Sequence, residues 1–338
     1  MTENYIYAPD TNAGFKCRVP LENTQQVFVI DGKVQGNNSF AGKEGGFSLH
    51  LNRGVVEERM IQVIYVRKRG PEALNYVSEF FIEKNARAQV LLCSHTMSET
   101  AFIMEEEIPV TLQENAFLDL VVMQNEHNNS SHKTFFKVNM AAGAVLRLNL
   151  ITLHGGDISN NIEVNLNGKD ADCELNGLYL TDREQKVSTQ VELNHNSPEC
   201  RSLQLFKGIL DDKSVTRFSG KILVAKDSQK TEAYQANNNL LVSKEAKAFT
   251  QPHLVIYADD VKCSHGATVG SLDQDELFYM RSRGISLHEA KLLQQQAFAH
   301  AVLTKIINDG LRERLSDLVE RRLRGEFTRC DDCSKHCC

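Results

Sequence analysis

The 338-residue sequence lacks several features that would assign it to a familiar class of protein. It has no apolar run near the roughly 20 residues that a membrane-spanning helix needs. Its first ten residues carry neither the basic nor the apolar stretch of a secretion signal. Basic runs are also missing, and 38 basic side chains stand against 44 acidic ones. These absences predict a cytoplasmic protein without a membrane or nucleic-acid partner.

Catalytic motifs are missing as well. Gly220-Lys221-Ile222 lacks the glycine-rich lead and the hydroxyl of a phosphate-binding loop, so the chain is not expected to be an ATPase. The nucleophile motif Gly-x-Ser-x-Gly and the zinc motif His-Glu-x-x-His do not occur. A sugar-cleaving enzyme needs aromatic platforms and paired carboxylates, but the sequence has no tryptophan and no obvious carboxylate pair. We expect no enzymatic activity and no catalytic residue.

The middle of the chain contains an internal repeat. It is marked by alanines that each open a short alternating run, at steps of 30, 28 and 27 residues: Ala86, Ala116, Ala144 and Ala171. A second series, with steps of 26 and 27, consists of valines: Val138, Val164 and Val191. Turns are predicted at Gly155-Gly156, Asn160-Asn161 and Asn167-Gly168. A fixed period with only β signals predicts stacked coils, which bury their apolar faces against one another; a β-sandwich is the alternative.

The two ends of this repeat have signals of their own. Asp31-Gly32 predicts a tight hairpin turn after a short strand. After Gly270, Asp273-x-x-Glu276 and Ser286-x-x-Glu289 are capping boxes, which open helices. The helices are expected to stop at Gly284 and Gly310, with a third helix after the latter. Their apolar stripes predict packing against the end of the stacked coils.

Cys263 and His265 stand two positions apart, directly after the strand-like run Leu254 to Tyr257. In an extended segment, residues two apart point the same way. Sulfur and imidazole nitrogen are ligands that iron, zinc and copper prefer. A buried structural cysteine with a hydrogen-bonded histidine is the alternative interpretation. His127 and His132 flank a polar stretch, which we expect to be a loop between coils and not a metal site.

The block from Asp259 to Gly270, Asp-Asp-Val-Lys-Cys-Ser-His-Gly-Ala-Thr-Val-Gly, resembles the C-terminal signature of the SufB/SufD family, the scaffold subunits of the Suf iron–sulfur cluster assembly system. Leu-Phe-Tyr-Met-Arg-Ser-Arg-Gly at 277–284 continues the match, which extends upstream through 231–243 and loosely to Ala86. The resemblance implies a mainly β protein with a right-handed parallel β-helix core. We expect a small mixed segment at 1–75, the core at 76–270, a C-terminal α-helical domain that contacts an ATPase at 271–325, and a tail at 326–338. Relatives usually carry a longer helical N-terminal region.

The resemblance also implies where the chemistry takes place. In the family, clusters are assembled where the SufB and SufD solenoids meet, which makes His265 a ligand to iron or a proton acceptor, with Cys263 as the adjacent thiol. The SufB branch has Cys-Asp-Ser where this chain has Asn237 to Asn239, and Glu where it has Gly266. Both differences remove ligands, so the match is to the SufD branch. We expect a SufB-like partner subunit, a SufC-type ATPase, no cofactor held stably by the chain alone, and transient iron or an Fe–S cluster in the complex.

The C-terminal tail departs from the family motif. Without a secretion signal, the nine cysteines are expected to be reduced thiols. The tail gathers five candidate ligands with spacing that could wrap one tetrahedral metal: Cys330, Cys333, His336, Cys337 and Cys338. A solvated tail without a role, or a redox role, are the other interpretations. If the tail binds metal, the alternative function is a stand-alone homodimeric Fe–S or metal carrier.

Overall fold

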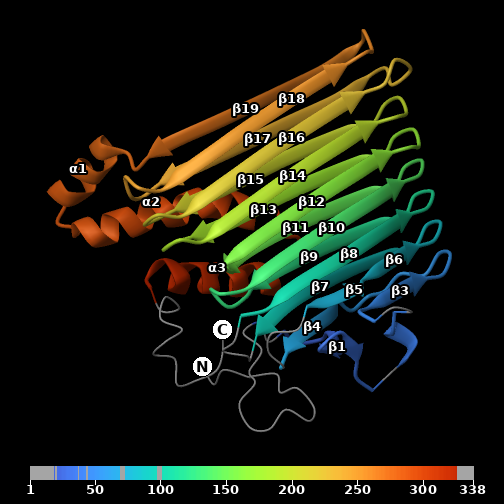
Figure 1. Ribbon diagram of the computed structural model, residues 1–338. Coiled ribbons are helices and arrows are strands. Elements are labelled where there is room, and N and C mark those ends of the chain that lie inside the picture. Colours follow the sequence, from blue (N-terminus) through green and yellow to red (C-terminus); the bar gives the residue numbers. More distant parts are fainter. Residues whose placement is uncertain are drawn as a thin grey trace.

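The computed structural model describes residues 19, 21–36, 38–42, 45–68, 73–96 and 101–325. Within them the chain forms a parallel β-solenoid, whose coils add strands alternately to two stacked sheets (Figure 1). The ten-stranded sheet contains, in spatial order, β19 (Val261–Ser271), β17 (Thr231–Leu241), β15 (Arg201–Leu210), β13 (Asp172–Thr181), β11 (Val145–His154), β9 (Phe117–Asn125), β7 (Arg87–Thr96), β4 (Ile61–Arg67), β1 (Gln25–Ile30) and β2 (Lys33–Val34). The nine-stranded sheet contains β18 (Lys247–Ile256), β16 (Val215–Val224), β14 (Lys186–His195), β12 (Asp157–Leu166), β10 (Ser131–Met140), β8 (Ile103–Leu112), β6 (Glu79–Ile82) and β3 (Ser48–Leu51), with β5 (Leu74–Val77) paired to β8. The predicted solenoid is confirmed, and the sandwich alternative is excluded by the parallel pairing.

The alanine repeat marks one corner of each coil. The four alanines are at most 1% exposed, and each follows a residue with positive φ: Asn85, Asn115, Gly143 and Asp170. Asn, Asp and Gly tolerate this left-handed backbone, and a small side chain fits the tight corner that follows. The next strands are in register, since Val145 pairs with both Phe117 and Asp172.

The valine series holds for one step only. Val138 pairs with Val164, but Val191 pairs with Ile162, so the series slips by two residues. The glycine pairs at 155–156 and the Asn-Gly at 167–168 lie between strands as predicted. Asn160-Asn161 was predicted as a turn, but it lies in the middle of β12, where the side chain of Asn160 is buried. This prediction is wrong because an inward-facing asparagine can be satisfied inside the solenoid.

The sheets begin earlier in the chain than the expected core boundary at residue 76. β1 pairs in parallel with β4, and β3 pairs in parallel with β6, so strands before that boundary already belong to both sheets. The predicted hairpin is confirmed: β1 and β2 pair antiparallel around Asp31 and Gly32, which both have positive φ. A short 3-10 helix follows at Asn38–Phe40.

Three helices follow β19: α1 (Gln274–Ser282), α2 (Leu287–Leu303) and α3 (Asp309–Leu323). Asp273 accepts hydrogen bonds from the first-turn amides of α1, and Ser286 accepts one from the amide of Glu289, so both predicted caps are confirmed. Gly284 follows α1 with a φ of +87°. The predicted stop at Gly310 is wrong, because α2 ends at Leu303 and Gly310 lies in the first turn of α3.

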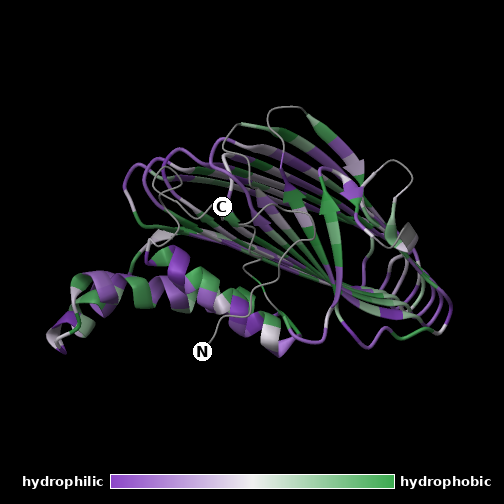
Figure 2. Cartoon of the chain, turned by 90° about the horizontal axis from the view of Figure 1, so that it is seen from below, coloured by the Kyte–Doolittle hydropathy of each residue, from purple (hydrophilic) through white to green (hydrophobic). Residues whose placement is uncertain are grey.

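Helices α2 and α3 pack on the outer face of the ten-stranded sheet, and not on the end of the solenoid as predicted. Figure 2 shows them along one side of the stacked strands. Buried side chains of the two helices form one cluster with outward-facing side chains of the sheet. The helices contribute Val302, Leu315 and Leu318, and the strands contribute Leu91, Val121, Ile151 and Leu178. Alternate residues of the same strands, such as Leu120 and Leu148, face the interior. This sheet is therefore apolar on both faces.

The helices leave the last coil of the solenoid uncovered. β18 and β19 are the edge strands of their sheets at this end, and within the described residues no strand pairs beyond them (Figure 1). Most of β19 is exposed in consequence. This open end carries the residues that the sequence singled out.

Candidate functional site

Cys263 and His265 lie on β19, the edge strand of the open end. Cys263 stacks on Ala233 and His265 stacks on Gln235 in β17, the strand one coil below. Since Ala233 and Gln235 are buried, Cys263 and His265 face the interior side of a coil that nothing covers. His265 is accordingly exposed and open to a second molecule.

Cys263 is more enclosed than His265. It packs at the edge of a small apolar cluster with Ile222, Val224 and Ala258. Burial raises the pKa of the Cys263 thiol, partly offset by a hydrogen bond from the backbone of Ala233. At neutral pH the group is therefore a thiol, and it can bind metal as a thiolate only if the metal or a nearby base takes its proton. The four cysteines in the described part of the chain, Cys93, Cys173, Cys200 and Cys263, are free.

Asn237 occupies the position where the SufB branch has its cysteine, and here it is a structural residue. It is fully buried, and its amide donates to the Tyr179 hydroxyl at 3.0 Å and to the Phe206 carbonyl at 3.3 Å. Asn239 donates to its side-chain oxygen at 2.8 Å, and Tyr179 donates to Asn239 at 2.7 Å. The three polar side chains satisfy one another inside the solenoid, so this position offers no ligand at the open end.

Exposed apolar side chains surround the open end. Tyr257 and Val269 are 63% and 44% exposed, and Ile256 and Phe249 on β18 are exposed as well. Helix α1 projects from the same end (Figure 1) and exposes Phe278 and Tyr279. Exposed aromatic groups beside unpaired strand edges are typical of a protein interface.

A second polar cluster, which the sequence did not reveal, lies inside the solenoid. His132 was expected in a loop, but it belongs to β10 and is buried. Its Nδ1 is 3.1 Å from Glu126 Oε1 and its Nε2 is 3.8 Å from Glu106 Oε2. Ser78 donates to Glu106 at 2.6 Å and is itself 2.6 Å from the Tyr65 hydroxyl. The available signal was the alternation along the strands: Glu106 and His132 occupy inward-facing positions, and the inward-facing positions are apolar from Ile108 onward in β8 and from Phe136 onward in β10.

This cluster is held together by charge. Burial alone would lower the pKa of His132, but the contacts with Glu106 and Glu126 raise it to about 9. The imidazolium is thus protonated at neutral pH and lies between two carboxylates, an arrangement in which removing one member leaves an uncompensated buried charge. His127, the other half of the motif, accepts a hydrogen bond from the amide of Asn129. The two histidines do not form a metal site.

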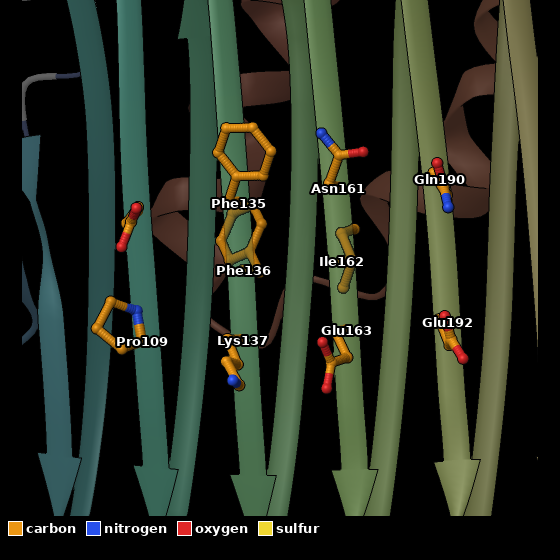
Figure 3. Close-up of a pocket in the computed structure, with 10 residues that line it drawn as sticks. Pro109, Phe135, Phe136, Lys137, Asn161, Ile162, Glu163, Gln190 and Glu192 are labelled. Atoms are coloured by element: carbon orange, nitrogen blue, oxygen red, sulfur yellow. The ribbon is translucent and has the colours of Figure 1, made fainter. Parts of the chain in front are cut away.

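A shallow groove of about 380 Å³ lies on the outer face of the nine-stranded sheet (Figure 3). Glu163 and Glu192 are in register there, so a carboxylate pair exists that the sequence did not make obvious. Glu192 is 2.9 Å from the Lys221 ammonium, and Glu163 accepts a hydrogen bond from Asn165. Both carboxyl groups thus accept hydrogen bonds from side chains of the same sheet.

No group of three or more His, Cys, Asp or Glu residues in the described ranges is arranged to hold a metal ion. The open end supplies two candidate groups, one imidazole and one thiol. Cys330, Cys333, His336, Cys337 and Cys338 lie outside the described residues.

Comparison with known proteins identifies the family. Residues 71–298 match the family described as SUF system FeS cluster assembly, SufBD core domain. The chain therefore belongs to the SufBD family of iron–sulfur cluster assembly proteins. Within it, the chain is similar to SufD: it is 31% identical to the iron–sulfur cluster assembly protein SufD of Escherichia coli over 277 residues, which cover 82% of this chain and 63% of that protein.

Two further relatives belong to the same family. An iron–sulfur cluster assembly SufBD family protein of Synechocystis is 35% identical over 215 residues, covering 63% of this chain and 47% of the relative. One of Mycobacterium leprae is 29% identical over 226 residues, covering 64% and 58%. The chain thus spans about half to three fifths of the length of these relatives. No helix in the described ranges is long and apolar enough to cross a membrane.

Proposed function

We propose that this chain is a SufD-type scaffold subunit that contributes His265, with Cys263 beside it, to a cluster-assembly site shared with a second subunit. The observation that supports this most directly is the exposure of His265 on the interior side of an uncovered edge strand. A neutral imidazole there can bind iron, or accept the proton of an incoming thiol. Iron and the nascent cluster are cargo of the site and not resident cofactors.

The number of ligands argues for a shared site. A cluster usually takes about four thiolate-type ligands, and the open end of this chain supplies two groups at most. Asn237 is committed to Tyr179 and Phe206, so it cannot be recruited without breaking a buried network. We therefore assign the remaining ligands to a partner subunit. The chain performs no complete reaction alone, and we propose a scaffold without enzymatic activity.

The form of the open end supports a second solenoid as the partner. Two edge strands of ten and eleven residues, β18 and β19, present unpaired backbone groups side by side. A solenoid whose last coil is bare exposes apolar and hydrogen-bonding surface that a neighbouring coil would otherwise cover. The end of a second solenoid fits both strands at once, which favours a SufB-like subunit over a globular partner.

The C-terminal helices supply the second contact. Helices α2 and α3 are fixed to the sheet, whereas α1 projects with Phe278 and Tyr279 exposed. We assign this projecting surface to a SufC-type ATPase, as the family resemblance implies. Assembly would take place in the cytoplasm, without nucleic acid or membrane, where the four described thiols remain reduced.

The test is a co-expressed complex with SufB-like and SufC-like subunits, purified without oxygen. His265→Ala is expected to lower cluster loading at least tenfold, because metal sites respond on this scale even to loss of groups that only support the ligands. His253→Ala is the matched control, since His253 is an exposed histidine on the neighbouring edge strand β18. Normal loading in His265→Ala with an intact complex would refute the ligand role and leave only assembly.

A further inference from the structure

The final coils stack three inward-facing side chains into a column. Gln204 in β15 pairs with Gln235 in β17, which pairs with His265 in β19. Across the interior, Gly220 in β16 leaves room for the glutamine: a Cβ at this position would lie 2.2 Å from Gln235 Nε2. The side chain of Gln235 therefore reaches across the interior at the level just below His265.

One hydrogen bond joins the two glutamines, and each of them keeps one buried group unpaired, the Nε2 of Gln204 and the Oε1 of Gln235. Gln235 Nε2 donates to Gln204 Oε1 at 2.7 Å. Gln235 is 3% exposed, and its Oε1 is buried without a hydrogen-bond partner. A buried acceptor that has left water without gaining a donor is costly, so native structures rarely leave one unpaired.

The coil above offers one suitable donor at this level. His265 stacks on Gln235, and Pro252 stacks on Gly220. Proline has no N–H to give, whereas one ring nitrogen of a neutral imidazole always carries a proton. The Thr250 hydroxyl also lacks a partner, but it stacks on Phe218, two residues along the strand. His265 has no hydrogen-bond partner among the described residues, so its exposed ring is free to turn toward the glutamine.

We propose that Gln235 is a positioning residue for His265: its Oε1 accepts the hydrogen bond of one ring N–H, which fixes the tautomer and directs the other nitrogen to the rim of the solenoid. This inference rests on the proposed function, because a fixed tautomer matters if His265 binds iron or takes a proton. Ligating histidines usually donate their second ring N–H to an oxygen in this way, which fixes the orientation of the ring and makes the ligand more basic. Gln204 in turn accepts a hydrogen bond from the amide of Gln235 and so fixes the orientation of the side chain that positions His265.

The experiment reads the histidine ring directly. The isolated full chain is labelled with 15N-histidine, His265 is assigned by comparison with His265→Ala, and the tautomer ratio is measured from the long-range nitrogen–proton correlations of the ring. Gln235→Leu is expected to change this ratio about three- to tenfold, the range that one hydrogen bond supplies. Gln235→Glu keeps an acceptor oxygen and is expected to restore the wild-type tautomer. Gln251→Leu, an exposed glutamine of β18, is the control and should change nothing.

Two outcomes separate this inference from the proposed function. An unchanged tautomer ratio in Gln235→Leu overturns the role of Gln235, whatever the cluster loading of His265→Ala. A changed ratio supports it even if loading proves indifferent to His265. If Gln235→Leu does not fold, Gly220→Ala serves instead, because its new methyl group displaces the amide without altering residue 235; an unchanged ratio there is equally contradictory.

Discussion

The guanidinium of Arg322 lies 2.8 Å from the carboxylate of Asp182 and joins the last helix to the outer face of the ten-stranded sheet. Arg322 Nε also donates to the carbonyl of Leu153 at 3.0 Å, and the arginine side chain is 5% exposed. Two ends of the chain segment 153–322 are thus joined by one side chain. The contact holds α3 against the outer face of the solenoid.

Arg322→Ala is expected to destabilise the protein by about 3 kcal/mol, because it leaves the mostly buried Asp182 without its counter-charge. Urea unfolding of the two proteins measures the difference. Arg324→Ala is the control, since Arg324 pairs with Glu289 and Glu320 at the surface, where ion pairs contribute less than about 1 kcal/mol. Equal midpoints for Arg322→Ala and Arg324→Ala would show that the contact with Asp182 does not anchor the helix.

The buried cluster of His132 predicts a loss of stability in alkaline solution. The pKa of His132 is raised to about 9 in the folded protein, above the value of an unfolded histidine, so the native state retains a proton that the unfolded chain releases. This contribution is complete at pH values below the unfolded pKa and is lost as the pH rises through about 9. The midpoint of urea unfolding should therefore fall between pH 7 and pH 10.

His132→Gln is the variant that tests this origin. Its stability should be lower at neutral pH but should fall less between pH 7 and pH 10 than that of the wild type. His253→Gln alters an exposed histidine and should follow the wild-type curve. A variant curve parallel to the wild type would mean that other groups titrate in this range.

Substitution of Asp119 is expected to stabilise the protein, whereas substitution of His132 is expected to destabilise it. It is fully buried on β9, and burial raises the pKa of its carboxyl to about 7, although Arg147 partly offsets this shift. Because the folded pKa exceeds the unfolded value, the native state loses stability as the pH rises from about 4 through 7. Asp119→Asn removes this cost and should stabilise the protein at pH 8 by at least about 2 kcal/mol, since each pKa unit corresponds to about 1.4 kcal/mol.

The measurement is thermal or urea unfolding of Asp119→Asn at pH 5 and pH 8. The gain should be small at pH 5, where the native carboxyl is already protonated. Asp259→Asn, at an exposed position, should show no gain at either pH. A loss of stability in Asp119→Asn at pH 8 would indicate that the carboxylate is ionised and needed by Arg147.

The C-terminal tail is tested by metal content. If Cys330, Cys333, His336, Cys337 and Cys338 bind iron or zinc, EDTA-resistant metal should remain with the full chain and disappear on truncation after Gly325. Elemental analysis of both proteins after dialysis against EDTA measures this. Equal metal content would remove the tail as a metal site and, with it, the homodimeric carrier as an alternative.

Local signals in the sequence predicted local structure well. Asp31-Gly32 specified a hairpin, and Asp273 and Ser286 specified helix starts, because each depends on a few neighbouring residues. The alanine series predicted the coils, since a tight corner requires a small residue at every turn of the solenoid. The predicted helix stop at Gly310 was wrong because glycine also occurs in the first turn of a helix. The start of this helix is fixed by another residue, the N-cap Asn308.

Features that depend on register or on distant partners could not be predicted. The apolar stripes of α2 and α3 showed that these helices are buried, but not which surface covers them. The polar composition around His132 suggested a loop, because its partners lie on other parts of the solenoid, Glu106 on β8 and Glu126 just after β9. The sequence predicted that Cys263 and His265 point to the same side of one extended segment. The column beneath His265 could not be predicted, because it depends on the register of three strands.

The most direct test of the account is pulsed EPR of the cluster bound to a reconstituted complex in which only this chain carries 15N-histidine. If His265 is a ligand, the reduced cluster should show a 15N hyperfine coupling that is present in His253→Ala and absent in His265→Ala. A cluster loaded to the normal level without any 15N coupling from this chain would contradict the account.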